Sequence, residues 1–350
     1  MIDDKRTLTD LPPHDLKALL QRVQNHCQDF NCPDVSRSVR QLLLSLFLYG
    51  LITAAGLWAF SAGQFWMLPL LLLPGAGLLV KLFIIQHDCG HGSYFKADWA
   101  NRWVGRLVSL FTLTPYAFWR DAHNKHHASS GNLDRRGIGG IDMITVAEFE
   151  NLSPFRKRLY RMYRHPLVLL TVGAPLHTIV IQRWPVTQSM PFLDAYHTIK
   201  GSHLLRSVMA LNAGLCVFYG LLMYLFGWLA VLAVFVPLMI LAAGVGGWLF
   251  YVQHQYDGTY WARHKDWDYK TAALLGSSHY ALPSILHWFT GNIGYHHIHH
   301  LVSKIPNYRL AECYRNSADL QRFPKLTIRD SIKAARLRLW DEKARRMVAF

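Results

Sequence analysis

The sequence predicts an all-α membrane protein, in which two transmembrane helical hairpins (four spans) carry a helical cap on the cytosolic side. Three observations support this fold class. No Lys, Arg, Asp or Glu occurs from Gln41 to Val80 or from Ser207 to Tyr256. Only 17% of the 350 residues are charged, against about 25% in typical soluble domains. All 37 basic residues lie outside these two stretches. The pattern argues against a water-soluble globule, a disordered chain or a disulfide scaffold.

The first charge-free stretch, residues 41–80, predicts two spans joined by a tight turn near Ser61–Gln64. The hydrocarbon core of a bilayer is about 30 Å thick, so one helical span needs about 20 apolar residues. We therefore expect a hairpin over residues 41–86, preceded by a cytosolic N-terminal segment of residues 1–40. This segment is polar, and nothing in it resembles a cleavable signal peptide.

The second charge-free stretch predicts another hairpin over residues 207–256, with its turn near Gly227. Residues 87–206 are expected to be cytosolic or interfacial, and residues 257–350 to form a cytosolic C-terminal region. Basic residues flank the spans and are absent from both turns, so the positive-inside rule places the termini and all long loops in the cytosol. This placement accounts for much of the formal charge of +15. In a bacterium, the membrane would be the cell inner membrane.

Three other segments are ambiguous. The apolar runs Leu107–Trp119 and His165–Gln182 are short, and we interpret them as interfacial or re-entrant helices. The alternative for His165–Gln182, a fifth span, would divide the histidine clusters described next between opposite sides of the membrane. The tail Thr327–Phe350 predicts a basic amphipathic helix that lies on the membrane surface or packs, solvated, on the cap.

The histidines are clustered rather than scattered. Nineteen are present, and nine of them lie in four groups near predicted span ends or in the cap. Spacings of i, i+3 and i+4 place side chains on one face of a helix. The nine residues in these groups are His87 and His91; His123, His126 and His127; His254; and His296, His299 and His300. The other ten show no ligand spacing: His14, His26, His165, His177, His197, His203, His264, His279, His287 and His297.

The clusters predict a His-rich dimetal site in the cytosolic cap. Neutral imidazole binds iron, copper, zinc and nickel well, and one metal takes three or four such ligands. Nine histidines therefore suggest two metals. Asp88, Asp121 and Asp257 lie near the clusters in sequence and could orient the rings through the second ring nitrogen. His254 is a single residue, and an ordinary interfacial histidine is the alternative there. The five cysteines form no CxxC pair and are expected to be free thiols.

The motifs around these histidines resemble the membrane fatty acid desaturase family, and most closely its acyl-lipid branch. The resemblance covers residues 41 to 308. It is carried by four segments of this sequence: His87-Asp-Cys-Gly-His91, His123-Asn-Lys-His-His-Ala-Ser-Ser-Gly-Asn-Leu-Asp134, Phe250-Tyr-Val-Gln-His-Gln255 with Trp261, and Gly291-Asn-Ile-Gly-Tyr-His-His-Ile-His-His-Leu301 with Ile305-Pro-Asn-Tyr308.

The resemblance implies a single desaturase domain, about residues 41–308, with two non-haem irons and O2 as co-substrate. The nine clustered histidines would be the iron ligands, with no catalytic residue beyond them. The product would be a cis double bond in an acyl chain carried by a phospholipid, a glycolipid or an acyl-CoA. Electrons would come from an external donor such as a ferredoxin, because no haem, flavin or iron–sulfur motif is present. One departure is Phe250, where the acyl-CoA branch has an Asn, and Asn292 is a candidate substitute.

Two other functions remain open at this level. A hydroxylase or other mono-oxygenase of a lipid or alkyl chain would use the same scaffold and ligand spacing. A metal transporter or sensor would also combine spans with histidines, but transporters place ionisable ligands near the bilayer midplane. Nucleic acid is not an expected partner, because interfacial aromatics and topology account for the Trp and basic residues. The position of the double bond is not encoded in the spacing.

Overall fold

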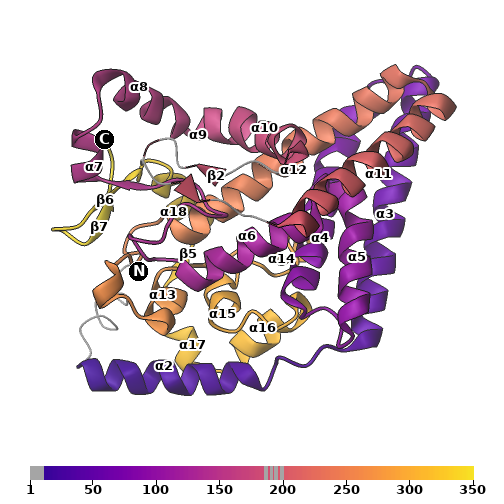
Figure 1. Cartoon of the computed structure of the whole chain (residues 1–350). Helices are drawn as coiled ribbons and strands as arrows, with labels where there is room; N and C mark the ends of the chain where they lie inside the picture. The colour runs from indigo at the N-terminus through magenta and orange to yellow at the C-terminus, as the bar shows by residue number, and fades with distance from the viewer. Residues whose placement is uncertain (1–11, 185–187, 190–191, 193–195, 198–200) are drawn as a thin grey trace.

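The computed structural model describes residues 12–184, 188–189, 192, 196–197 and 201–350. The first eleven residues of the expected N-terminal segment and the side chain of His197 lie outside the described residues. The described chain is mostly helical, as expected. Figure 1 shows that long helices form the upper right of the molecule, where two hairpin turns lie close together, and that short helices and strands gather at the other end.

The first hairpin consists of α3 (Val35–Ser61) and α4 (Met67–His91). Asp34 caps α3 by accepting a hydrogen bond from the backbone N–H of Arg37 at 3.0 Å. The turn between the helices follows Ser61, as predicted. α4 continues through the first histidine cluster and ends at Gly92, whose φ of 64° is the left-handed cap that favours glycine. His87 and His91 therefore lie on the last turns of a long helix.

The second hairpin consists of α11 (Ser202–Phe226) and α12 (Trp228–His254), with its turn at Gly227 as predicted. α12 packs closely against the first hairpin. A Cβ at Gly75 would lie 2.6 Å from Cδ2 of Leu238, so only glycine permits this approach of α4 to α12 without a shift of the leucine. The ends of α4 and α12 that carry histidines are thereby brought to the same end of the bundle.

Within the described residues, five helical segments are long and apolar enough to cross a membrane: the four above and Pro166–Arg183. The fifth is irregular. It comprises α9 (Pro166–Val168), a π-helical turn (Leu169–Gly173), α10 (Ala174–Ile179) and a 3-10 turn (Ile181–Arg183). It crosses α12, where a Cβ at Gly244 would lie 2.9 Å from the carbonyl oxygen of Leu170 (Figure 1). Its interfacial placement stays a prediction.

The other short apolar run, Leu107–Trp119, does not form one helix. It is divided between α5 (Asp98–Thr112) and α6 (Tyr116–Ser129), because Leu113 adopts a left-handed φ of 55° and Pro115 follows. α5 packs on α4, and the second histidine cluster lies on α6.

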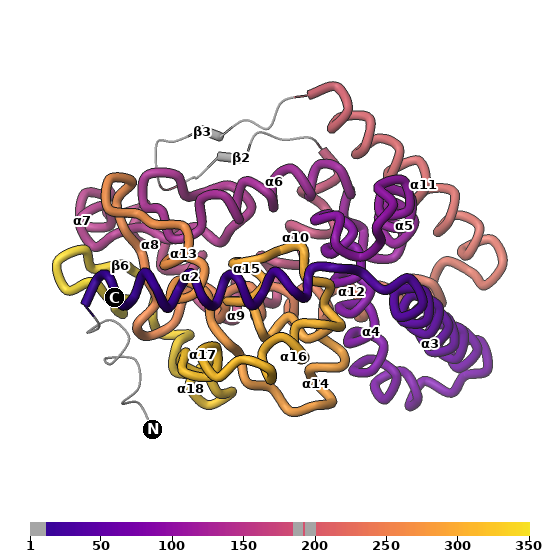
Figure 2. The backbone as a smooth tube through the Cα atoms, turned by 90° about the horizontal axis from the view of Figure 1, so that it is seen from below, coloured from indigo at the N-terminus to yellow at the C-terminus, as the bar shows by residue number. Residues whose placement is uncertain are grey.

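The remaining short helices build the cap around the histidine-bearing helix α15 (His296–Leu301). α2 (Pro13–Gln28) runs across α15 in the view from below (Figure 2). Leu19 and Val23 of α2 belong to one buried cluster with Ile298 and Leu310, and burying such a side chain contributes about 1.5–3 kcal/mol. The other cap helices are α7 (Val146–Glu150), α8 (Pro154–Tyr163), a 3-10 turn (His264–Asp266), α13 (Tyr269–Leu275), α14 (Ser284–Phe289), α16 (Asn307–Arg315), α17 (Ala318–Gln321) and α18 (Ile328–Ala334).

The prediction of one amphipathic helix over Thr327–Phe350 is wrong. Only α18 is helical, and the chain then forms β6 (Leu339–Asp341) and β7 (Arg346–Val348). Leu339, Trp340 and Met347 are buried, which a surface helix would not allow. The Asp341 carboxylate accepts two backbone N–H groups and closes the hairpin turn.

The strands are short and pair over long sequence distances. β1 (Ile144–Thr145) pairs in parallel with β6, which pairs antiparallel with β7. β4 (His279–Tyr280) pairs in parallel with β5 (Lys325–Leu326), and β2 (Gln188–Ser189) pairs antiparallel with β3 (Tyr196–His197). The first sheet joins the C-terminal tail to the loop that follows the second histidine cluster.

Candidate metal centre

The structure brings all nine clustered histidines together, although they come from four separate helices. His87 and His91 lie at the end of α4, and His254 is the last residue of α12. The other six lie on α6 and α15. None of the nine is more than 8% exposed. The ends of both hairpins and two cap helices therefore enclose one buried cluster of imidazoles.

Five of the nine form a first group: His87, His91, His123, His127 and His299. One ring nitrogen from each lies within 4.8 Å of all the others. Nε2 of His127 is 3.1 Å from Nε2 of both His123 and His299. Nitrogens about 2.1 Å from one metal lie about 3.0 Å apart when they occupy neighbouring octahedral positions. The observed spacing fits ligands that share an ion.

A second group consists of His126, His254 and His300, with ring nitrogens within the same 4.8 Å limit. His296 extends it, because its Nε2 lies 3.0 Å from Nε2 of His254. His126 and His254 are separated by 3.1 Å between the same atoms. The two groups are adjacent, since the rings of His127 and His300 stack with centroids 4.0 Å apart.

The protonation state suits metal binding. Burial lowers the pKa of His123, His126 and His127 well below the ordinary 6.5, and it does the same for the pKa of His296, His299 and His300. These rings are therefore neutral at pH 7 and offer a lone pair. Among the described residues, Nε2 of His91 and Nε2 of His300 are buried without a hydrogen-bond partner. Orphaned imidazole nitrogens inside such a cluster fit a metal.

Polar groups behind the histidines fix their ring orientation. Oδ1 of Asp88 lies 3.1 Å from Nδ1 of His87, and Oδ2 of Asp88 accepts from the backbone and side-chain N–H groups of Asn307 at 2.7 and 2.8 Å. Nδ1 of His254 lies 3.3 Å from the carbonyl oxygen of Gly276 and 3.4 Å from Oγ of Ser130. In His87 and in His254 these contacts occupy Nδ1, so Nε2 is the nitrogen left for a metal.

Comparison with known proteins agrees with this geometry. Residues 64–331 match the family described as fatty acid desaturase. A fatty acid desaturase of Bacillus subtilis is 36% identical over 341 residues, which cover 96% of this chain and 91% of the relative. This chain belongs to the fatty acid desaturase family. The resemblance carried by the histidine motifs is confirmed, and the protein is an enzyme of lipid desaturation.

More distant relatives of this desaturase carry more specific names. An sn-1 acyl-lipid omega-3 desaturase (ferredoxin) of Synechocystis sp. is 30% identical over 313 residues, covering 86% of this chain and 80% of the relative. An endoplasmic reticulum acyl-lipid omega-3 desaturase (cytochrome b5) of Arabidopsis thaliana is 26% identical over 313 residues, covering 86% and 75%. These relatives differ in the electron donor that they name.

Of the four residues expected to orient the histidine rings, Asp88 contacts one of the nine clustered histidines, as described above. Asp121 instead lies 3.5 Å from Arg120 and 3.4 Å from His203, and neither is in the cluster. Asp257 is exposed and belongs to neither group. Asn292 adopts a φ of 57° and donates from Nδ2 to the carbonyl oxygen of Asn307 at 3.2 Å, so it holds the chain beside Asp88 rather than a ring of the second group.

Aromatic residues seal the cluster. Phe250 occupies the place one turn before His254, and its ring centroid lies 5.0 Å from that of His126 and 5.1 Å from that of His254. Trp119 stacks on His123 at 4.5 Å. His297 lies on the other face of α15 and stacks with His279 at 5.5 Å, outside both groups. The apolar ring of Phe250 therefore lies against the second group at the position where the acyl-CoA branch has an Asn side chain.

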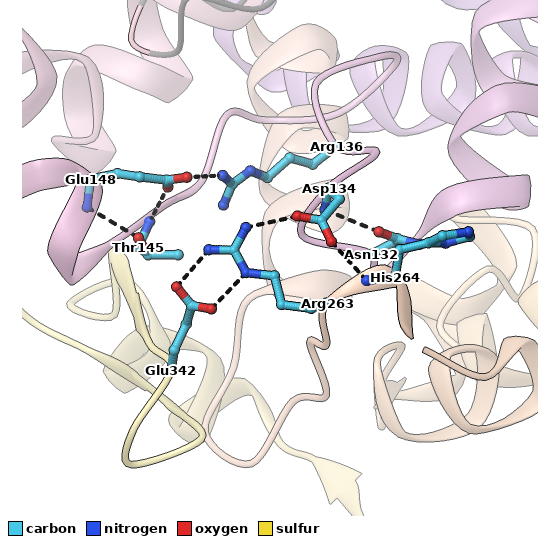
Figure 3. A network of polar contacts seen from close by, with 8 residues as sticks. All are labelled: Asn132, Asp134, Arg136, Thr145, Glu148, Arg263, His264 and Glu342. Atoms are coloured by element: carbon cyan, nitrogen blue, oxygen red, sulfur yellow. Dashed lines mark hydrogen bonds and ion pairs between the residues drawn. The ribbon is translucent and has the colours of Figure 1, made fainter. Parts of the chain in front are cut away.

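The segment after the second cluster is paired with the segment after His254. The backbone N–H of Leu133 donates to Ala262 at 2.9 Å, and the N–H of Ala262 donates to Gly131 at 2.9 Å. Figure 3 shows the polar network around this pairing, in which Arg263 binds Asp134 at 2.7 Å and both carboxylate oxygens of Glu342. The sequence offers a signal for this in the Asn-Leu-Asp134 run, but spacing alone does not reveal the partner.

Proposed function

We propose that this desaturase converts a –CH2–CH2– unit of a membrane lipid-linked acyl chain to a cis –CH=CH– unit. The balanced reaction consumes one O2, two electrons and two protons, and it yields two waters. The observation that carries the proposal is the pair of adjacent, buried imidazole groups at the ends of two apolar hairpins. Two irons bound there would supply the oxidant that cleaves an unactivated C–H bond, which no side chain can do.

The geometry supports a division of the nine ligands between the two irons. One iron would be held by the first group, which contains five histidines, and the other by the second group together with His296. Asp88 would orient His87, and the Gly276 carbonyl would hold His254 in the tautomer with Nε2 free. The protein's role is to keep these rings neutral, fixed and shielded from water.

We propose four spans, with the site and both termini in the cytosol. The contact between His126 and His254 supports an even number of crossings between them, because residues 3.1 Å apart lie on the same side of the membrane. α11 and α12 supply two crossings. A third by Pro166–Arg183 would separate the two histidines, so we place that segment at the interface. The basic flanks support the cytosolic side.

The substrate carrier and electron donor are proposed from relatives and charge. The cyanobacterial relative is named as an acyl-lipid enzyme that uses ferredoxin. A formal charge of +15 favours an acidic one-electron carrier, steered electrostatically to the cytosolic face. Two reduced carriers would deliver the two electrons of one turnover.

Expression in a bacterium that has no fatty acid desaturase of its own tests the function. Mass spectrometry of extracted lipid acyl chains should show a new double bond with the wild-type chain and none with His126→Ala. His203→Ala, whose exposed ring lies outside both groups, is the matched control and should retain the product. A hydroxylated chain instead would indicate the mono-oxygenase function. Unchanged lipid in membranes that contain folded, iron-loaded wild-type protein, O2 and a reductant would refute desaturation.

A further inference from the structure

One arginine is completely buried beside the second histidine group. Arg164 follows α8 and has no exposed surface. Nη1 donates to the carbonyl oxygen of Asp142 at 2.6 Å, and Nη2 donates to Oη of Tyr251 at 3.2 Å and to Oε1 of Gln255. These three acceptors are uncharged oxygens. Removing a cation from water costs several kcal/mol, and these hydrogen bonds, the nearby Asp142 carboxyl and the Tyr251 ring offset that cost here.

Two of the acceptors flank His254 on α12. Tyr251 lies three residues before it, and Gln255 follows it directly. Oη of Tyr251 also donates to the carbonyl oxygen of Leu337 at 2.6 Å, and Nε2 of Gln255 donates to that of Ile141 at 3.4 Å. The guanidinium therefore holds the end of α12 on both sides of the histidine.

The third acceptor belongs to the loop that covers His126. A Cβ at Gly139 would lie 2.8 Å from the carbonyl oxygen of Ala122 and 3.3 Å from Cβ of His126. A Cβ at Gly140 would lie 3.9 Å from Nδ1 of the same histidine. Asp142, two residues further on, is the loop residue that Arg164 binds. One guanidinium thus joins the backbone that carries His254 to the loop that packs on His126.

We propose that Arg164 is a positioning residue of the second metal site. It fixes the α12 terminus and the 139–142 loop relative to each other, and so sets the separation of His254 and His126. This inference rests on the proposed metal-binding role of the second group. It assigns no chemistry to Arg164, which acts only through Gln255, Tyr251 and Asp142.

The planar fork of arginine suits this role. It directs several N–H groups at separate acceptors in one plane, whereas a lysine ammonium is a point charge on a flexible stem. Arg164→Met fills similar space but leaves the buried oxygens of Tyr251, Gln255 and Asp142 without this donor, so it should unfold at a lower temperature in detergent. It should also lose the geometric constraint, with Arg164→Lys intermediate.

The test titrates the purified full-length chain in detergent with ferrous iron under anaerobic conditions. The measured quantity is the number of tightly bound irons per chain. Wild type should bind two. Arg164→Met should bind one tightly and the second about 10–100-fold more weakly, as expected when an outer contact of a metal ligand is lost. With His126→Ala added, the chain should still bind one iron tightly, at the first group. With His91→Ala and His123→Ala added, which leave three of the five rings of the first group, it should bind none tightly. This pattern identifies the second group as the affected site, because a general loss of stability would weaken iron binding at both groups.

Arg136→Met is the matched control. Its side chain is 8% exposed and pairs with Glu148 (Figure 3), and neither residue belongs to a histidine group, so two irons should remain. If Arg164→Met binds both irons with wild-type affinity, the inference is overturned. Should that variant fail to fold, Tyr251→Phe combined with Gln255→Met removes both side-chain links between Arg164 and α12, and two tight irons in this double variant would overturn the inference equally. A wild-type chain that binds two irons without desaturating lipid would contradict the proposed function. The iron titration of the Arg164 variants would still test the inference in that case.

Discussion

Nε2 of His126 and Nε2 of His254 lie 3.1 Å apart although 128 positions separate the residues in the chain. One comes from a cap helix and the other from the last residue of a long hairpin helix. This contact joins the second histidine cluster to the single histidine that had the weakest sequence signal. It is the most direct structural support for including His254 in the metal centre.

His254→Ala should therefore reduce bound iron from two to one per chain and abolish unsaturated product. The ring supplies one of four nitrogens of the second group, and its loss opens that site while the first group keeps its five. Inductively coupled plasma mass spectrometry on purified protein measures the stoichiometry. His264→Ala, an exposed histidine outside both groups, should keep both irons. Two irons in His254→Ala would remove this residue from the ligand set.

Asp88→Asn should weaken the first iron site by about 10–100-fold. The amide keeps the size of the side chain but lacks the charge that orients His87 and accepts two N–H groups of Asn307. Competition with a chelator measures the affinity. Asp121→Asn is the control, because Asp121 contacts Arg120 and His203 instead. Equal affinities in the two variants would contradict the orienting role of Asp88.

Gly139→Ala should destabilise the chain by about 1–3 kcal/mol and lower iron occupancy of the second group. Its φ is 65°, and the new Cβ would lie 2.8 Å from the carbonyl oxygen of Ala122. Gly140→Ala, with ordinary φ and no atom closer than 3.9 Å, should change neither property. Thermal unfolding in detergent and iron analysis compare the neighbours. A tolerated Gly139→Ala would show that the loop is free to move away from α6.

Acidification should destabilise the iron-free protein. Burial depresses the pKa of the six clustered histidines on α6 and α15 below 6.5. Below about pH 6.5 the unfolded chain takes up protons that the folded chain does not, so the free energy of unfolding falls as pH falls. Above pH 7 this contribution is present in full. Melting temperatures measured from pH 8 to pH 5 test this, and a flat profile with iron removed would contradict it.

The parts of the molecule that sequence predicted are those set by local spacing. Charge-free length located both hairpins and their turns, and i, i+4 spacing placed His87 and His91 on one helical face. Asn307 and Arg164 escaped prediction because their importance depends on partners far away in sequence. Asn307 had a faint signal in the Pro-Asn-Tyr308 run, whereas Arg164 looked like one more basic residue near an apolar run. The tail was mistaken for a helix because Trp340 is paired with Thr145 of β1, which lies far away in sequence, and Met347 is paired with Trp340 in turn.

The two groups of imidazoles are not contributed by separate helices. α6 gives His123 and His127 to the first group and His126 to the second, and α15 gives His299 to the first and His296 and His300 to the second. A single turn of each helix thus spans both sites, with a pitch of about 5.4 Å. The separation between two bound ions would be fixed by backbone hydrogen bonds within these helices. Each hairpin adds to one group only, α4 with His87 and His91 to the first and α12 with His254 to the second, so the two cap helices tie the sites to each other.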